Sequence, residues 1–210
     1  MGEDVFRVSL LLLWGCLFGM RAYYAAKLRR VGARVTRGRH AVAREGIWNV
    51  AAQVTVFLLL VSALAIYAAR PEWMNPLTLP FPRWVRWAGV LLGVLSLLLL
   101  VWVQETLGRQ WSMGLELREQ HALVTAGPYR WVRHPMYSAL FAFLVAQCLI
   151  SANVMFLLGT AISVALVYRR IPLEEAMLTG RFGDEYLEYM RNTGRFWPRI
   201  AWGRRRSGKG

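Results

Sequence analysis

Long uninterrupted runs of apolar residues alternate along this chain with shorter polar segments. Three such runs cover residues 5–26, 47–69 and 85–103. A helix rises about 1.5 Å per residue and the hydrocarbon core of a bilayer is about 30 Å thick, so each run is long enough to cross a membrane. The pattern therefore predicts an all-α membrane protein that begins with three spans.

A further apolar stretch, residues 137–167, is interrupted near its middle by Ser151, Ala152 and Asn153. These residue types are typical of turns, so we expect two short helices joined by a tight turn, each about 14 residues or about 21 Å long. Such arms must tilt, thin the bilayer or extend beyond it at the cytoplasmic end. One long bent helix is the alternative, which Asn153 disfavours. The chain then has about five transmembrane helices.

The polar segments divide the chain further. Prolines at positions 71, 76, 80 and 82 predict an extended loop between the second and third spans. We expect a three-span membrane region over residues 1–106 and a second part, rich in polar motifs, over residues 107–200. Residues 201–210 form a basic tail that we expect to be disordered.

Charge sets the expected orientation. The chain is 56% hydrophobic with a formal net charge of +14. Most lysines and arginines lie in the loop after the first run, in residues 104–135 and after residue 168, whereas Arg7, Arg70, Arg83 and Arg86 lie on the other side. The positive-inside rule places the N-terminus outside and the C-terminus in the cytoplasm. The basic residues flank apolar runs, which favours contact with anionic lipids over nucleic-acid binding.

Small residues inside the apolar runs predict packing and no metal chemistry. Two Gly-x-x-x-Gly patterns, at residues 15–19 and 89–93, permit close contact between helices. Cys16 and Cys148 are far apart in apolar runs and resemble small hydrophobic residues, which predicts neither a disulfide nor a metal site. The acidic start of the chain favours a retained first helix over a cleaved signal peptide.

The dense polar motifs all follow the third run. Gly127 and Pro128 predict a turn, and Pro135 suits the first turn of the next helix. His134 would then stand at the mouth of that helix, where free backbone N–H groups and the helix dipole favour an anion. The alternative is a set of interfacial anchors. In that case the aromatic belt consists of Tyr129, Trp131 and Tyr137, and lipid phosphates are contacted by Arg130 and Arg133.

A second charged group follows the last apolar run. Arg170 and Glu174 are spaced i, i+4 and share a helix face, and Glu175 follows directly. A weak surface ion pair is one interpretation. Ionisable groups at the end of a membrane span are functional candidates, however, and the hairpin should bring them back beside His134. Pro172 permits a bend in this segment.

Taken together, the motifs resemble a known family. They are Leu-Gly-Arg-Gln-Trp-Ser at residues 107–112, His-Ala-Leu-Val-Thr-Ala-Gly-Pro-Tyr-Arg-Trp-Val-Arg-His-Pro-Met-Tyr at 121–137, the glutamate pair at 174–175 and Phe-Gly-Asp-Glu-Tyr-Leu-Glu-Tyr at 182–189. The set resembles the isoprenylcysteine carboxyl methyltransferases and the related phospholipid N-methyltransferases, over residues 107–198. The resemblance implies an integral membrane methyltransferase that uses S-adenosylmethionine in a cytoplasmic pocket, with residues 107–200 as its core.

The resemblance also assigns residues. Arg170 matches the arginine that holds the substrate carboxylate, and Glu175 matches the second glutamate of the pair, so these two form the expected catalytic set. The expected cofactor contacts are His121, Leu123, Val124, Tyr129, His134, Pro135, Tyr137 and Glu174.

Arg170 favours a carboxylate acceptor, because a guanidinium would repel an amine. We therefore expect O-methylation of an isoprenylcysteine-like lipophilic substrate that enters from the bilayer. The alternatives are N-methylation of a phospholipid or small amine, in which Glu175 would hold the amine, and a non-catalytic membrane protein that binds lipid or serves in assembly.

Overall fold

A computed structural model of the chain describes residues 2–30, 43, 45–108 and 123–199. Regular structure within these ranges is helical, which confirms the all-α prediction. The expected basic tail, residues 201–210, lies outside the described residues. The elements are α1 (Gly2–Arg30), α3 (Ile47–Ala69), the 3-10 helix η1 (Pro71–Leu77), α4 (Arg83–Leu107), the 3-10 helix η3 (Gly127–Arg130), α5 (Pro135–Ser151), α6 (Val154–Phe182) and α7 (Asp184–Asn192).

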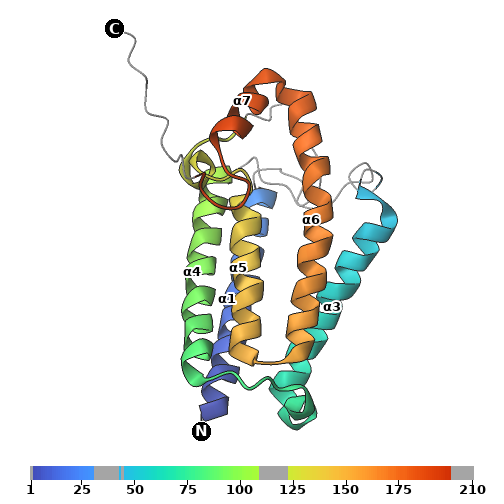
Figure 1. The fold of residues 1–210 in the computed structure, drawn as a ribbon, viewed down its shortest axis with the longest axis vertical. Coiled ribbons are helices and arrows are strands. Elements are labelled where there is room, and N and C mark those ends of the chain that lie inside the picture. Colours follow the sequence, from blue (N-terminus) through green and yellow to red (C-terminus); the bar gives the residue numbers. More distant parts are fainter. Residues whose placement is uncertain (1, 31–42, 44, 109–122, 200–210) are drawn as a thin grey trace.

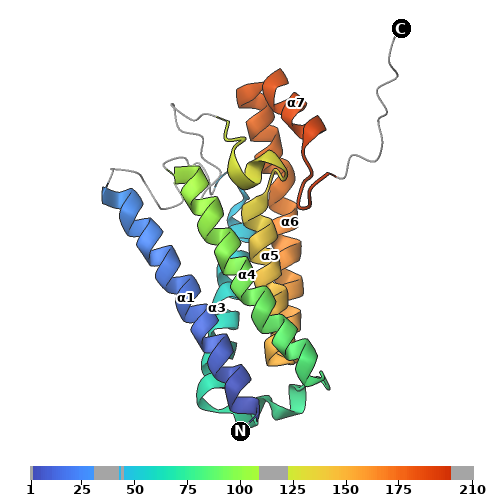
Figure 2. The same ribbon diagram turned by 90° about the vertical axis from the view of Figure 1, so that its left-hand side faces the viewer.

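Five of these helices form a membrane-type bundle. Helices α1, α3, α4 and α6 are long and apolar enough to cross a bilayer, and α5 is apolar but shorter, with 17 residues. The bundle has α1, α4 and α5 on one side and α6 with α3 on the other (Figure 1). The N-terminus lies at one end, here called the N-terminal end, and α7 lies at the opposite end, here called the α7 end (Figures 1 and 2).

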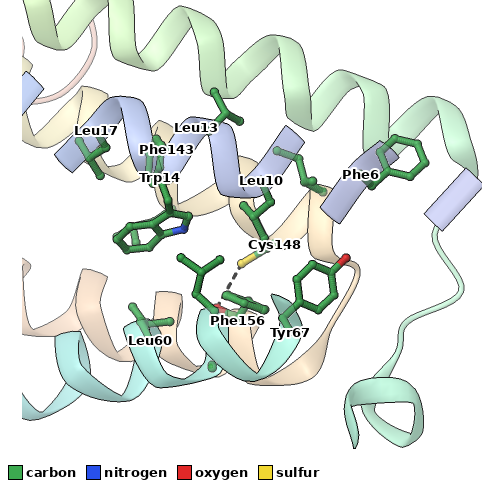
Figure 3. Packing of buried hydrophobic residues seen from close by; sticks show 14 of the residues in the cluster. Phe6, Leu10, Leu13, Trp14, Leu17, Leu60, Tyr67, Phe143, Cys148 and Phe156 are labelled. Atoms are coloured by element: carbon green, nitrogen blue, oxygen red, sulfur yellow. Dashed lines mark hydrogen bonds between the residues drawn. The ribbon is translucent and has the colours of Figure 1, made fainter. Parts of the chain in front are cut away.

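An apolar core joins α1 and α3 to the α5–α6 hairpin (Figure 3). Trp14 of α1 packs edge-on against Phe143 of α5, with ring centroids 5.5 Å apart. Tyr67 of α3 packs in the same way on Phe156 of α6, at 5.7 Å. Such edge-to-face pairs fix the relative rotation of helices as well as burying area.

Glycines bring α4 close to its neighbours. A Cβ atom on Gly89 would stand 2.7 Å from Cβ of Leu149, and one on Gly93 would stand 2.6 Å from Cδ1 of Leu13. This pattern therefore serves internal packing against α5 and α1. The other pattern, Gly15 and Gly19, has no atom of the described residues within 4 Å of the corresponding positions.

The turn between α5 and α6 confirms the predicted hairpin. Ala152 has the left-handed conformation, with φ 47°, and the Asn153 side chain caps α6 by accepting a bond of 2.9 Å from the Met155 N–H. The Asn153 Nδ2 atom donates to the Met74 carbonyl of η1 at 3.0 Å. This amide thus fixes both the turn and the connection packed beneath it.

The second arm of the hairpin is longer than expected. Helix α6 has 29 residues, or about 44 Å, and it continues through Pro172 without a break. Pro172 is exposed, whereas Ile171 and Glu175 are buried and hold the helix against the rest of the molecule on both sides of the proline. Tertiary packing therefore overrides the bend that the proline permits.

The connection after α3 also differs from expectation. Its first part, Pro71–Leu77, is a 3-10 helix rather than an extended loop. The fixed φ of proline, near −65°, is compatible with 3-10 geometry as well as with extended backbone. The chain is extended only beyond this helix, where Thr78 and Pro82 have ψ angles of 135° and 153°.

A buried arginine fastens the N-terminal end of the bundle. Arg86 of α4 donates from Nε to the Ile150 carbonyl at 2.9 Å and from Nη1 to Glu3 at 2.6 Å. Its guanidinium lies 4.1 Å from the ring centroid of Phe6. We call this group the Arg86 clamp, since it caps the end of α5 and ties it to α1 and α4.

Candidate active site

The polar motifs converge at the α7 end, around the start of α5. As predicted, Pro135 is the first residue of the helix and His134 precedes it. Among the described residues no side chain caps this end. Gly127 has φ 56°, and a Cβ there would meet Thr106 at 2.6 Å, so this glycine lets η3 pack against the end of α4.

Glu175 of α6 is the centre of the charged cluster. Its Oε1 atom lies 3.2 Å from His134 Nε2 and 3.3 Å from Arg133 Nε, and Arg195 reaches both carboxylate oxygens, at 3.2 and 2.5 Å. The Glu175 side chain is only 8% exposed. Because the contact between His134 and Glu175 joins the two arms of the hairpin, it confirms the prediction that folding brings these residues together.

Arg195 belongs to a segment that pairs with the chain before α5. Residues 193–196, here called the C-terminal strap, lie beside residues 131–134, and an isolated parallel bridge joins Val132 to Gly194. The N–H groups of Arg133 and His134 donate to the carbonyls of Gly194 and Arg195, at 2.8 and 3.1 Å. The bond to Glu175 raises the pKa of Arg195 above its usual value, so the arginine stays charged.

Arg133 has an internal role. Besides Glu175, its Nη1 atom bonds the carbonyls of Met190 at 3.0 Å and Thr193 at 2.5 Å. The side chain is 10% exposed, so it serves the site rather than the lipid phosphates that one interpretation of the sequence assigned to it. Arg130, by contrast, is exposed, with its guanidinium 5.3 Å from the centroid of Trp131.

Glu174 lies against tyrosines rather than arginines in this cluster. The Tyr137 hydroxyl of α5 donates to its Oε2 atom at 2.8 Å. Burial and the nearby Glu174 charge raise the pKa of Tyr129 well above its usual value. Burial also raises the pKa of Tyr189 to about 12, so its hydroxyl stays protonated and donates to the Tyr129 carbonyl at 2.7 Å.

Aromatic rings border the charged cluster. His134 stacks on Tyr137 with centroids 5.6 Å apart, and Phe196 of the strap packs edge-on against Phe141 at 5.4 Å. Tyr168 of α6 lies 6.2 Å from the same Phe196 ring. The site therefore offers flat apolar faces beside its carboxylates and cations, a combination suited to a ligand with both ring and charged groups.

Arg170 points to a partner outside the predicted motifs. Its Nη2 atom lies 3.4 Å from Oε1 of Glu45, a residue just before α3, and the two side chains are 11% and 0% exposed. Glu45 was not found by sequence reasoning, because it stands among basic residues with no motif around it. Burial of a carboxylate is costly without a compensating cation, and Arg170 supplies one here.

Tyr186 of α7 carries a buried hydroxyl. Its side chain is almost fully buried, and the oxygen has no hydrogen-bond partner within the part of the chain that the structure describes. Burial first and the charge of Glu175 second raise its pKa, so the group is a neutral donor. A buried hydroxyl without a hydrogen-bond acceptor, beside charged groups, is a candidate donor to a bound ligand or water.

Most of the expected site residues thus lie together. Tyr129, His134, Pro135, Tyr137, Glu174 and Glu175 meet where α5, α6 and η3 approach one another. Leu123 and Val124 are half-buried in the segment that leads into η3. His121 lies outside the described residues. The strap residues Arg195 and Phe196 were not predicted from the sequence. The strap has only four residues, which is too short for a pattern of polar and apolar positions to indicate pairing.

The fold and site define a class of protein, namely a polytopic helical membrane protein with a charged site on an α5–α6 hairpin. A model of the isoprenylcysteine carboxyl methyltransferase (ICMT) family matches residues 89–180. Protein-S-isoprenylcysteine O-methyltransferase A of Arabidopsis thaliana is 31% identical over 150 residues, which cover 66% of this chain and 76% of that protein. The chain belongs to the isoprenylcysteine carboxyl methyltransferase family.

Two further similarities show the range of relatives. The nickel-cobalt-cadmium resistance protein NccN of Alcaligenes xylosoxydans xylosoxydans is 27% identical over 159 residues, which cover 75% of this chain and 66% of that protein. The solved structure of the eukaryotic intramembrane Ras methyltransferase ICMT matches with a TM-score of 0.51 and 27% identity, covering 72% of this chain and 50% of that chain. This chain therefore spans only part of the length of these two relatives.

Proposed function

We propose that this protein is an integral membrane methyltransferase that uses S-adenosylmethionine and methylates the carboxylate of an isoprenylcysteine-like lipophilic acceptor. The observation that carries the proposal is the meeting of His134, Tyr137 and Glu174 with the Glu175 cluster in a member of this family. These groups lie at the α7 end of an apolar hairpin, which suits an enzyme that takes a polar cofactor and a lipid acceptor.

The residues fit the chemistry of the cofactor. S-adenosylmethionine has an ammonium, a carboxylate, ribose hydroxyls and a flat adenine. The Glu174 carboxylate suits the ammonium or the hydroxyls, the start of α5 without a side-chain cap suits the carboxylate, and Tyr186 offers an unmet hydroxyl. We propose the cofactor set His121, Leu123, Val124, Tyr129, His134, Pro135, Tyr137 and Glu174.

The bound cofactor would supply an electrophilic methyl group beside a positively charged sulfur. The protein has to align and desolvate the acceptor, and it needs little proton transfer because a carboxylate is already a nucleophile. Arg170 would hold one acceptor oxygen and leave the other free to attack.

Glu175 would act by positioning. Arg133, His134 and Arg195 engage its carboxylate, so we assign it to holding the start of α5 and the strap in place rather than to proton transfer. His134 contributes to this positioning through the contact of its Nε2 atom with Glu175.

We propose the orientation that the charges predict, with the N-terminal end outside and the α7 end in the cytoplasm. Exposed tryptophans support two interfacial belts: Trp84 and Trp87 begin α4, and Trp102 near its other end packs on Trp131 at 6.0 Å. Residues 1–106 would then anchor the bundle, and residues 107–200 would form the core of the enzyme.

An amine of a phospholipid or small molecule is the second candidate acceptor. The observation that favours it is the buried Glu45 beside Arg170, because this carboxylate cancels the charge that would otherwise repel an ammonium group. A non-catalytic lipid-binding or assembly protein would require neither the cofactor nor an acceptor.

Transfer of a tritiated methyl group from S-adenosylmethionine to N-acetyl-S-farnesylcysteine and to phospholipids tests the proposal. A base-labile product identifies an ester, and a base-stable one identifies an amine. Absence of S-adenosylmethionine binding by calorimetry, even at millimolar ligand, would reject the enzyme.

Arg170→Lys and Arg170→Ala test the proposed contact between Arg170 and the acceptor carboxylate. We expect kcat/KM for the carboxylate acceptor to fall about 10-fold to 100-fold, as expected for one charged hydrogen bond, with cofactor affinity unchanged. Unchanged kcat/KM in both variants would remove Arg170 from the acceptor site.

A further inference from the structure

Glu45 is the carboxylate that meets Arg170 in the structure. The Nη2 atom of Arg170 lies 3.4 Å from Oε1 of Glu45, whose side chain is fully shielded from solvent. Glu45 precedes α3, in the N-terminal half of the chain, and it lies outside residues 89–180 that match the family. The contact therefore joins the N-terminal part of the chain to α6.

Glu174 and Glu175, the two other glutamates near Arg170 on α6, have partners of their own. Glu174, one helical turn further along α6, accepts the Tyr137 hydroxyl, and Glu175 is surrounded by Arg133, His134 and Arg195. Arg170 forms an ion pair with Glu45, with Nη2 and Oε1 3.4 Å apart. A guanidinium paired in this way attracts a second carboxylate far less than an uncompensated one does.

We propose that Glu45 is a specificity-determining residue: its carboxylate is an internal counter-ion of Arg170 that the acceptor carboxylate must displace in order to bind. This inference rests on the proposed function, in which Arg170 holds the acceptor. Exchange of one carboxylate for another brings little net electrostatic gain, so the free energy of binding has to come from the apolar tail of the acceptor. Small carboxylates without a lipid tail are thereby excluded.

Binding without methyl transfer tests the displacement directly. The probe is N-acetyl-S-farnesylcysteine, and the control ligand is its carboxamide, which has the same tail and no charge. In Glu45→Gln, which keeps the shape of the side chain, we expect the Kd of the acid to fall about 5-fold to 10-fold and that of the amide to stay constant. S-adenosylmethionine affinity should not change.

A matched variant and a milder one complete the design. Glu72→Gln removes an exposed glutamate of η1 and should leave both Kd values as in the wild type. Glu45→Asp keeps the charge but shortens the reach, so it should tighten acid binding by less than the glutamine does. It also serves as the test if Glu45→Gln does not fold.

The outcomes separate the two proposals. An acid Kd that stays constant or rises in the Glu45 variants, or an amide Kd that falls as much as that of the acid, overturns the role of Glu45. A Kd that responds as expected, together with no transfer of labelled methyl to the bound acid, supports the counter-ion and overturns the proposed function instead.

Discussion

The two ends of the bundle both bury an arginine beside a carboxylate, yet they use it differently. In the Arg86 clamp the carboxylate of Glu3 is 72% exposed. The other contacts of Arg86 are with the Ile150 carbonyl and the Phe6 ring. At the α7 end the carboxylates of Glu175 and Glu45 are the buried partners, 8% and 0% exposed.

This difference distinguishes a structural contact, the Arg86 clamp, from a candidate ligand-binding site at the α7 end. An arginine that caps a helix end satisfies carbonyls and needs no particular partner in solvent. A buried carboxylate, in contrast, has to be surrounded by cations from several segments, and at Glu175 these come from the start of α5 and from the strap. Such convergence is costly for folding alone, and it is typical of places where charged ligands bind.

Glu175→Gln should have the largest effect, because it removes the charge on which two segments depend. Breaking a buried ion pair from one side costs about 3–5 kcal/mol, so the melting temperature should drop and the strap should become sensitive to protease. We expect methyl transfer to fall more than about 100-fold. Thermal unfolding and limited proteolysis in detergent measure the first two effects.

The control for this variant is Glu188→Gln, at an exposed position of α7. It should keep the stability and activity of the wild type. Equal stability and full activity in Glu175→Gln would mean that the cluster does not hold the site together.

Arg86→Met should have a large effect on stability and none on the reaction. The substitution keeps apolar bulk but removes the cap on Ile150 and the pair with Glu3, which we expect to cost about 2–4 kcal/mol. The acceptor KM, measured on the folded fraction, should match that of the wild type. A changed KM would show that the two ends are coupled and that the contrast between them is wrong.

Tyr186→Phe should have the smallest effect. In contrast to Arg86→Met, it should change ligand binding and leave stability unchanged. The hydroxyl has no hydrogen-bond partner among the described residues, so its removal should leave the melting temperature constant or slightly higher. Because we expect the hydroxyl to donate to the cofactor, calorimetry should show about 3-fold to 10-fold weaker S-adenosylmethionine binding. Lower stability with unchanged cofactor affinity would place the hydroxyl in the framework instead.

Hydropathy and turn chemistry were sufficient to predict the bundle. Apolar runs have few alternatives in a bilayer, because every backbone polar group must be satisfied within a helix. The turn at Ala152 and Asn153, the start of α5 at Pro135 and the approach of His134 to Glu175 follow from local rules of the same kind.

The pairing of charges at the α7 end could not be predicted in this way. Three arginines and three glutamates permit many pairings, and only the folded distances assign Arg170 to Glu45 and Arg195 to Glu175. The length of α6 was underestimated for a related reason, since its polar turns beyond Tyr168 resemble a tail until Ile171 is seen to be buried.

The parallel pairing of the C-terminal strap has a consequence for how the protein is made. A ribosome releases the hairpin of α5 and α6 before it releases residues 193–196, so the helices can enter the bilayer while Glu175 still lacks Arg195. Until the strap emerges and pairs with Arg133 and His134, the nascent protein is an inserted bundle with an unfinished site. The site is therefore completed by a segment that follows the whole hairpin in the chain.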